Sequence, residues 1–190
     1  MNVTDQVNSE LQRLRQKLDA PNLPAGPQAT AAVLVPLAAR SGELEVLYIR
    51  RSDSVATHRG QIAFPGGRTS PSDANLLATA LRETHEEIGL APSAVEVLGA
   101  MPAMRTISGS LTVAPFAGFI PVWTELQPEP REVAEIFTVP LDVLRDQRHR
   151  GYYEWSNGAS SSRHPAILHQ GRVIWGFTYR VTRDLLEMLS

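Results

Sequence analysis

The sequence of 190 residues contains no cysteine. Disulfides, thiolate metal sites and a cysteine nucleophile are therefore excluded, because each needs a cysteine sulfur. Lysine is nearly absent as well, and Lys17 is the only one. The formal net charge of −2 argues against a dedicated nucleic-acid-binding protein, since such proteins are usually basic. A small anionic ligand held by a local group of arginines stays compatible with this charge.

Long apolar runs are also missing. The longest apolar stretch, residues 111–123, is too short to span a bilayer and is interrupted by Pro115 and Pro121. Residues 1–10 are polar and lack the apolar core of a secretory signal. We therefore expect a soluble cytoplasmic protein that does not engage a membrane.

The chain is expected to fold as one domain preceded by a helix and a linker. Residues 3–18 place apolar side chains on one helical stripe. Residues 21–28 contain three prolines and a glycine, which is typical of a linker. We assign residues 1–28 to the N-terminal helix and linker, and residues 29–190 to the main domain.

Strands alternate with helices along the main domain. One helix is expected from Ser70, as its N-cap, to Gly89, as a left-handed C-cap. A short helix is expected from residue 141, and a closing helix over residues 177–189. Strands are expected at residues 31–38, 44–50, 61–64, 95–98, 112–120, 136–139, 151–155, 166–169 and 172–175, the first two forming a hairpin. This order predicts an α/β fold with a mixed β-sheet sandwiched between α-helices.

Three carboxylates share one face of the helix that ends at Gly89. Glu83, Glu86 and Glu87 are spaced i, i+3 and i+4, in the turns where the helix dipole is negative. Each like-charge contact there costs about a few tenths of a kcal/mol, and Arg82 can offset part of it by pairing with Glu86. A divalent cation would reverse the sign, and hard oxygen ligands suit Mg²⁺ or Mn²⁺. A solvated acidic face is the alternative interpretation.

A glycine pair precedes this helix. Gly66 and Gly67 follow Phe64-Pro65 and are followed by Arg68. Two glycines let the backbone approach a ligand or a metal closely and leave a carbonyl free for coordination. A plain tight turn would need the same residues.

Residues 67–90 resemble the Nudix box, Gly-x5-Glu-x7-Arg-Glu-U-x-Glu-Glu-x-Gly-U, in which U is aliphatic. The matching positions after the first glycine are Arg82, Glu83, Glu86, Glu87, Gly89 and Leu90. Asp73 stands in place of the first glutamate, with eight residues instead of seven before the arginine, and Thr84 replaces an aliphatic residue. We expect Asp73 to act structurally, as an N-terminal helix cap.

The residues upstream of the box resemble the additional signature of the coenzyme A pyrophosphatase branch, Leu-Leu-Thr-x-Arg-Ser-x3-Arg-x3-Gly-x3-Phe-Pro-Gly-Gly. The matching positions are Leu47, Arg51, Ser52, Gly60 and residues 64–67. Tyr48, Ile49 and Ala56 depart from the signature, and Ala56 stands where it has an arginine. The signature is therefore only partly kept.

The resemblance implies a hydrolase that uses Mg²⁺ or Mn²⁺ to cut a diphosphate. The metal ligands implied are Gly67, through its carbonyl, with Glu83, Glu86 and Glu87. The catalytic residues expected are Glu86, Glu87 and Glu132, with Glu132 the first candidate for the general base, ahead of Glu129 and Glu135. The candidates for substrate contact are Arg51, Arg59, Gly66 and Arg68.

Several substrates and one other function stay open. Coenzyme A, cut to 4′-phosphopantetheine and adenosine 3′,5′-bisphosphate, is the first expectation. ADP-ribose or a dinucleotide is the alternative, because of the departures at Ile49 and Ala56. A non-catalytic nucleotide sensor, or an acidic interaction protein without a metal, is an alternative from another class. The expected partner is a small-molecule nucleotide, with no nucleic acid and no membrane, and a homodimer is left open.

Overall fold

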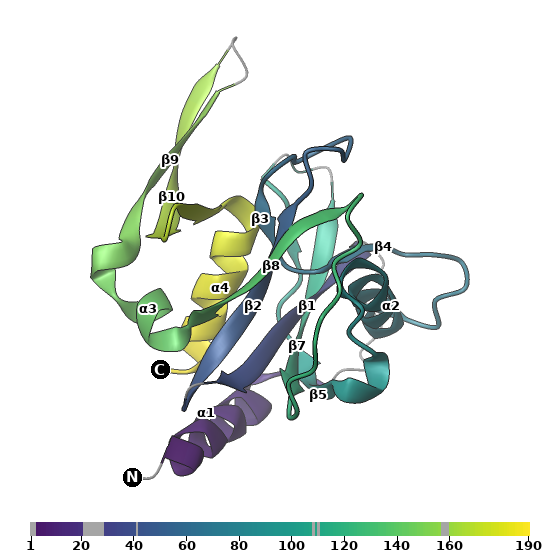
Figure 1. Cartoon of the computed structure of the whole chain (residues 1–190), viewed down its shortest axis with the longest axis vertical. Coiled ribbons are helices and arrows are strands. Elements are labelled where there is room, and N and C mark those ends of the chain that lie inside the picture. Colours follow the sequence, from purple (N-terminus) through teal and green to yellow (C-terminus); the bar gives the residue numbers. More distant parts are fainter. Residues whose placement is uncertain (1–2, 21–28, 41, 108, 110, 157–159) are drawn as a thin grey trace.

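The computed structural model describes residues 3–20, 29–40, 42–107, 109, 111–156 and 160–190 (Figure 1). The helices are α1 (Val3–Lys17), α2 (Leu76–Ile88), α3 (Leu141–Arg145) and α4 (Gly176–Met188). The strands are β1 (Ala29–Arg40), β2 (Glu43–Arg51), β3 (Ile62–Ala63), β4 (Gly66–Arg68), β5 (Glu96–Ala100), β6 (Met104–Arg105), β7 (Thr112–Ile120), β8 (Val133–Pro140), β9 (Arg150–Ser156), β10 (Ser161–His169) and β11 (Arg172–Trp175). The expected linker, residues 21–28, lies outside the described residues.

The main sheet opens where β1 and β2 diverge. β2 pairs antiparallel with β1 at residues 43–46 and with β3 at residues 49–50, while β8 runs antiparallel along its other edge. β1 pairs parallel with β7 over residues 29–38. β4 pairs antiparallel with β1 at residues 31–33. Residues 64–65 connect β3 on β2 with β4 on β1 across this opening, and the glycine pair lies in β4 itself.

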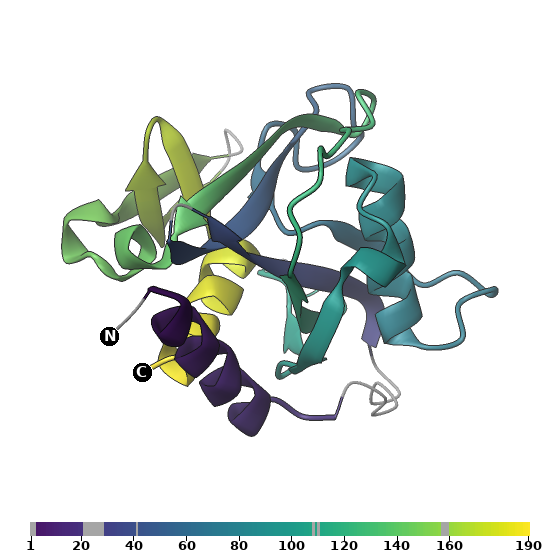
Figure 2. The same cartoon turned by 60° about the horizontal axis from the view of Figure 1, so that its bottom comes forward.

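Side chains that alternate along the strands build two cores. Ala32 and Leu34 of β1 face α2, whereas Val35 and Leu37 belong to the core that includes α1, α3 and α4. Figure 2 shows α1 and α4 together on one side of the main sheet and α2 on the other. The predicted fold class, a mixed sheet between helices, is confirmed.

A second, smaller sheet of β9, β10 and β11 projects from the main sheet (Figure 1). Its strands are antiparallel, and Ile167 and Ile174 anchor its base in the core that contains α4. The contact between β11 and β8 includes Arg172, whose guanidinium lies over the ring of Phe137 and pairs with Glu135. This sheet is called the arm below.

The expected start of the helix after the glycine pair was wrong. The helix begins at Leu76 and not beside Ser70, because Asn75 is its N-cap and accepts a hydrogen bond from the Ala78 amide at 2.9 Å. Residues 66–68 form β4 where a plain turn was an open alternative.

Among the described residues, no helix combines the length and apolar character needed to cross a bilayer.

The N-terminal helix is part of the packed structure. Val7, Leu11 and Leu14 of α1 are buried in the core shared with α4. Beyond α1, the backbone of Asp19 exchanges two hydrogen bonds of 3.0 Å with Ala100 at the end of β5. The stripe predicted over residues 3–18 therefore packs on the main domain, although this segment precedes β1.

We expect Leu14→Ala to lower the free energy of unfolding by about 2–5 kcal/mol, since Leu14 is fully buried and the change leaves a cavity. Gln12→Ala, at an exposed position two residues earlier, should change it by less than about 0.5 kcal/mol. Urea unfolding measures both. If Leu14→Ala changed the free energy of unfolding as little as Gln12→Ala, the burial of α1 in the core would be contradicted.

Candidate active site

The C-terminal end of the carboxylate-bearing helix α2 is held by a glycine cap and by a neighbouring loop. Its C-cap Gly89 has a left-handed φ of 71°, and the Gly89 amide donates to the His85 carbonyl at 2.9 Å. The amides of Gln127 and Glu129 donate to the carbonyls of Ile88 and Glu87 at 3.0 and 2.9 Å. A loop that precedes β8 thus satisfies the last turn of α2 and lies beside its carboxylates.

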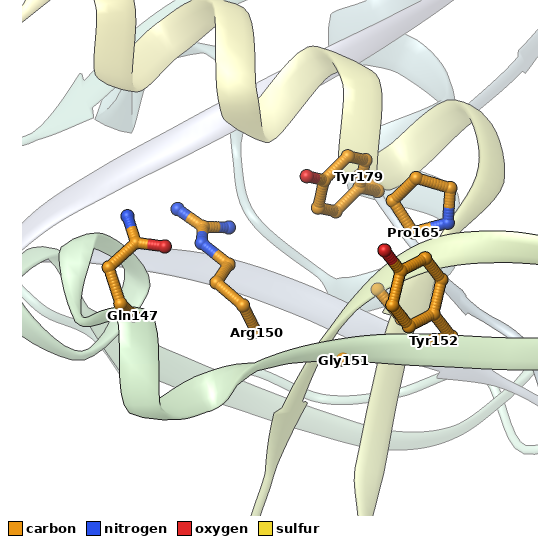
Figure 3. Close-up of a pocket in the computed structure, with 7 residues that line it drawn as sticks. Gln147, Arg150, Gly151, Tyr152, Pro165 and Tyr179 are labelled. Atoms are coloured by element: carbon orange, nitrogen blue, oxygen red, sulfur yellow. The ribbon is translucent and has the colours of Figure 1, made fainter.

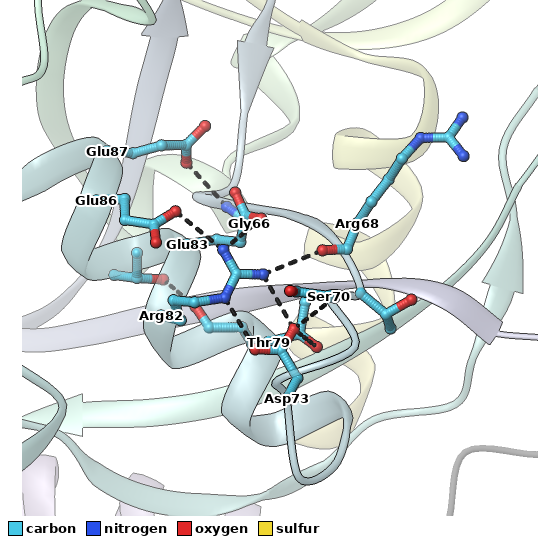
Figure 4. A network of polar contacts seen from close by, with 12 residues as sticks. Gly66, Arg68, Ser70, Asp73, Thr79, Arg82, Glu83, Glu86 and Glu87 are labelled. Atoms are coloured by element: carbon cyan, nitrogen blue, oxygen red, sulfur yellow. Dashed lines mark hydrogen bonds and ion pairs between the residues drawn. The ribbon is translucent and has the colours of Figure 1, made fainter.

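Asp73 holds Arg82 at the outer side of α2 (Figure 4). Arg82 donates from Nε to Oδ1 at 2.8 Å and from Nη2 to Oδ2 at 3.0 Å, a two-pronged contact. The Ser70 amide and the Thr79 hydroxyl donate to the same carboxylate, each at 2.8 Å. The hydrogen bonds from Arg82 hold the pKa of Asp73 well below its usual range. Asp73 is therefore structural, as expected, but it anchors Arg82 instead of capping the helix.

Arg82 also contacts two of the three glutamates. Its Nη1 donates to Glu83 Oε1 and to Glu86 Oε2, both at 2.9 Å, and the second contact is the predicted i,i+4 pair. Glu86 is half exposed, whereas Glu83 keeps only a fifth of its side chain accessible. Arg82 thus supplies positive charge to carboxylates that repel one another. The hydrogen bonds between Arg82 and Asp73 were not predicted from the sequence, because Asp73 lies before the helix and the two residues follow no helical spacing.

The glycine pair lies directly against the other carboxylates. The Gly66 amide donates to Glu87 Oε2 at 2.9 Å. A Cβ at residue 67 would meet Glu83 Oε2 at 2.4 Å, so a larger residue here would displace this carboxylate. The sequence therefore brings Gly66, Gly67, Glu83 and Glu87 together, as the motif suggested.

Glu87 is almost fully buried beneath β4. Burial raises its pKa to about 7, against the opposing effects of the Gly66 amide and of Arg51, whose Nη1 lies 3.6 Å from Glu87 Oε1. Burial also raises the pKa of Glu83. A neighbouring cation would favour the charged form of both carboxyl groups.

Glu132 approaches the same carboxylates from the loop before β8. Its charge contributes to raising the pKa of both Glu83 and Glu87. The Ser52 amide donates to its carbonyl at 2.8 Å, which ties this loop to the end of β2. Glu135, in contrast, pairs with Arg50 and Arg172 on the sheet face opposite α2. It is therefore turned away from the site.

Arg59 and Arg68 lie farther from the carboxylates than Arg51 does. Arg59 donates from Nε to the Val55 carbonyl at 2.8 Å, within its own exposed loop. The backbone carbonyl of Arg68 accepts from Arg82 at 3.2 Å, while its guanidinium points away from the glutamates (Figure 4). Of the four candidates for substrate contact, Arg51 and Gly66 touch the buried glutamate and the other two lie farther out.

The donor set fits a hard divalent cation. In the described part of the chain, no three acidic or histidine side chains converge as a metal-binding cluster, and Arg82 donates hydrogen bonds to Glu83 and Glu86. The glycine cradle against Glu83 and the buried carboxyl group of Glu87 nevertheless offer oxygen atoms beside an open backbone. Oxygen donors without histidine or cysteine suit Mg²⁺ or Mn²⁺.

Comparison with known proteins agrees with this geometry. The NUDIX domain model matches residues 28–156. The Nudix hydrolase NudL of Pectobacterium atrosepticum is 33% identical over 197 residues, covering 97% of this chain and 95% of the relative. The NudL of Yersinia enterocolitica is 37% identical over 161 residues, covering 84% of this chain and 81% of the relative.

Solved structures show the same fold. The Nudix hydrolase RenU of M. smegmatis has a TM-score of 0.56 at 22% identity, covering 84% of each chain. A NUDIX hydrolase of Alicyclobacillus acidocaldarius has a TM-score of 0.51 at 19% identity, covering 86% of this chain and 93% of the other. Members of the family typically use a divalent metal ion and act on nucleotide-like small molecules. The chain belongs to the Nudix family and is a Nudix hydrolase, a pyrophosphohydrolase.

Proposed function

We propose that the chain hydrolyses the diphosphate of coenzyme A, giving 4′-phosphopantetheine and adenosine 3′,5′-bisphosphate. The observation that carries this proposal is the contact between the two motifs. Arg51, from the coenzyme A-type signature, lies 3.6 Å from Glu87 of the Nudix box, on the face of the sheet covered by α2. The residues that suggest the substrate thus stand beside those that suggest the reaction.

We propose that the Gly67 carbonyl, Glu83, Glu86 and Glu87 hold Mg²⁺ or Mn²⁺. When bound, such an ion neutralises charge on the diphosphate and makes water a better nucleophile. Glu87 is the best-placed carboxylate, because the Gly66 amide fixes one oxygen and leaves the other toward Arg51. Arg82 holds Glu83 and Glu86 in reach through the two contacts of 2.9 Å.

Arg51 is proposed to bind the scissile diphosphate. Its side chain is a quarter exposed, and in the described structure its buried Nε has no hydrogen-bond partner. A buried donor of a charged group without an acceptor is unfavourable, and a phosphate oxygen would satisfy it. For Arg59 and Arg68, which lie farther out, we propose contacts with a remote phosphate of the substrate.

Glu132 is proposed as the general base. It is exposed on a loop whose backbone is held by Ser52 and Glu129, and its charge acts on Glu83 and Glu87. A carboxylate in this position can orient a water molecule and accept its proton as the phosphorus–oxygen bond forms. Glu135 is not proposed, because its two arginine partners lie on the other face of the sheet.

The departures from the coenzyme A-type signature bear unequally on the substrate. Ile49 is fully buried between strands, and Tyr48 is buried in the other core with its hydroxyl 2.9 Å from Thr182. Neither side chain faces a substrate, so neither argues against coenzyme A. Ala56 is exposed in the loop after β2, and this position keeps ADP-ribose or a dinucleotide as the second candidate.

Incubation with Mg²⁺ and, in parallel, coenzyme A, ADP-ribose and NADH tests the substrate. We expect mass spectrometry to show 4′-phosphopantetheine as the preferred product, with turnover lost in Glu87→Gln. Preferred cleavage of ADP-ribose or NADH would overturn the coenzyme A assignment and keep the reaction. Binding of nucleotide without any cleavage would favour a sensor on the same fold.

We expect Gly67→Ala to lower kcat/KM about 100-fold, since the new methyl group displaces the Glu83 carboxylate. The unfolding free energy should stay within about 1 kcal/mol, because the displaced group is the end of a flexible side chain. Steady-state kinetics and urea unfolding of the same preparation separate the two effects. Full activity in this variant would exclude the proposed role of the cradle.

Glu132→Gln should lower kcat by about 100-fold or more, since the amide cannot accept the proton. Glu129→Gln, in the same loop, is the matched control and should keep kcat nearly unchanged. Loss of kcat in the control variant alone would move the general base to Glu129. Full turnover in both would assign the proton transfer to a glutamate of the Nudix box.

A further inference from the structure

An open surface pocket of about 400 Å³, called the cavity below, lies between the arm and α4 (Figure 3). Arg150, Tyr152 and Pro165 of the arm line it, together with Tyr179 of α4 and Gln147 of the turn before β9. This volume is within the range of small-molecule sites. The cavity adjoins α4, on the side of the main sheet opposite α2, and none of its lining residues belongs to the candidate active site.

Arg150 brings an unbalanced positive charge to this cavity. In the described part of the chain it forms no ion pair, and its buried Nη1 has no hydrogen-bond partner. Its Nη2 donates to the Leu144 carbonyl at 2.7 Å, at the end of α3, which holds the guanidinium in place. A buried N–H of a guanidinium that lacks an acceptor is costly, and an anion would compensate it better than water does.

Two aromatic rings, those of Tyr152 and Tyr179, and the amide of Gln147 also line the cavity. The Arg150 guanidinium lies 6.0 Å from the ring centroid of Tyr179, and Figure 3 shows Tyr152 and Tyr179 facing the same space. Arg163 packs over the Tyr152 ring at 3.8 Å, but its Nε pairs with Glu154 at 3.3 Å, so Arg150 is the cation of the cavity without an acidic partner among the described residues. Among the described residues that line the cavity, none is acidic. The surroundings therefore favour a negatively charged group attached to a planar body.

We propose that this cavity is a second ligand site, which binds a small aromatic or heterocyclic anion, a phosphate monoester or a carboxylate. Arg150 binds the anionic group, the Tyr179 and Tyr152 rings contact the planar part, and the Gln147 amide adds a hydrogen bond at the rim. The site is independent of the substrate proposed above, because α2 and Arg51 lie across the main sheet from it.

Isothermal titration of the full chain with phenyl phosphate, benzoate and phenol, in EDTA and without added metal, tests this site. We expect one of the two anions to bind and phenol not to bind, and the better anion identifies the charged group. Arg150→Gln should weaken that binding about tenfold or more. Arg148→Gln, two residues away on an exposed side chain paired with Asp146, should leave it unchanged.

Two further variants keep the test decisive. Tyr152→Ala changes a side chain that is 56% exposed, so it should fold, and it should also weaken binding. Arg51→Gln should leave binding unchanged. The proposal is overturned if neither anion binds, if Arg150→Gln and Tyr152→Ala both bind as the parent does, or if Arg51→Gln alone abolishes binding, which would place the anion at the active site.

Discussion

The close approach of β4 to β1 and to the Glu83 carboxylate of α2 depends on glycine at residues 66 and 67. A Cβ on Gly66 would lie 2.3 Å from the Ala32 carbonyl oxygen, and one on Gly67 would lie 2.4 Å from a Glu83 carboxylate oxygen. The pairing of β4 with β1 holds this backbone in place, and the opening between β1 and β2 leaves room for it. Without that approach, Glu87 would have neither its backbone donor nor its burial.

The glutamates gathered at this place repel one another, and nearby arginines offset part of that repulsion. Three glutamates in the last turns of α2 repel one another and oppose the helix dipole. Arg82 contacts two of them and is itself held by Asp73, which lies before the helix. Glu87 has the Arg51 guanidinium at 3.6 Å, and burial still raises its pKa. The site is therefore arranged to gain from added positive charge at one buried carboxyl group.

Local signals in the sequence were sufficient for much of this arrangement. Gly89 ends α2 because glycine adopts the left-handed cap readily, and the spacing of Glu83, Glu86 and Glu87 places them on one face of the helix. Strand β7 was expected with its observed bounds, since it is a continuous apolar run. The family was correctly suggested from the motif residues that these elements carry.

Features set by contacts distant in sequence could not be predicted. The helix begins at Leu76 because the Asp73 carboxylate is engaged by Arg82 and Asn75 serves as the cap. β4 has little intrinsic strand preference, and its pairing with β1 is a tertiary contact. The sequence also contains nothing that separates Glu135 from Glu132 as a candidate base, whereas the pairing of β8 with β2 places Glu135 beside Arg50, on the face where Arg172 of the arm also pairs with it.

Manganese binding followed by electron paramagnetic resonance tests the central claim most directly, since it measures the carboxylate site without reference to any substrate. The account predicts that Mn²⁺ binds to the parent chain and that Glu87→Gln weakens this binding about tenfold or more. Glu154→Gln, on the exposed end of the arm, should bind as the parent does. Equal binding by the parent and Glu87→Gln would contradict the assignment of the buried carboxylate beneath the glycine pair as a metal ligand.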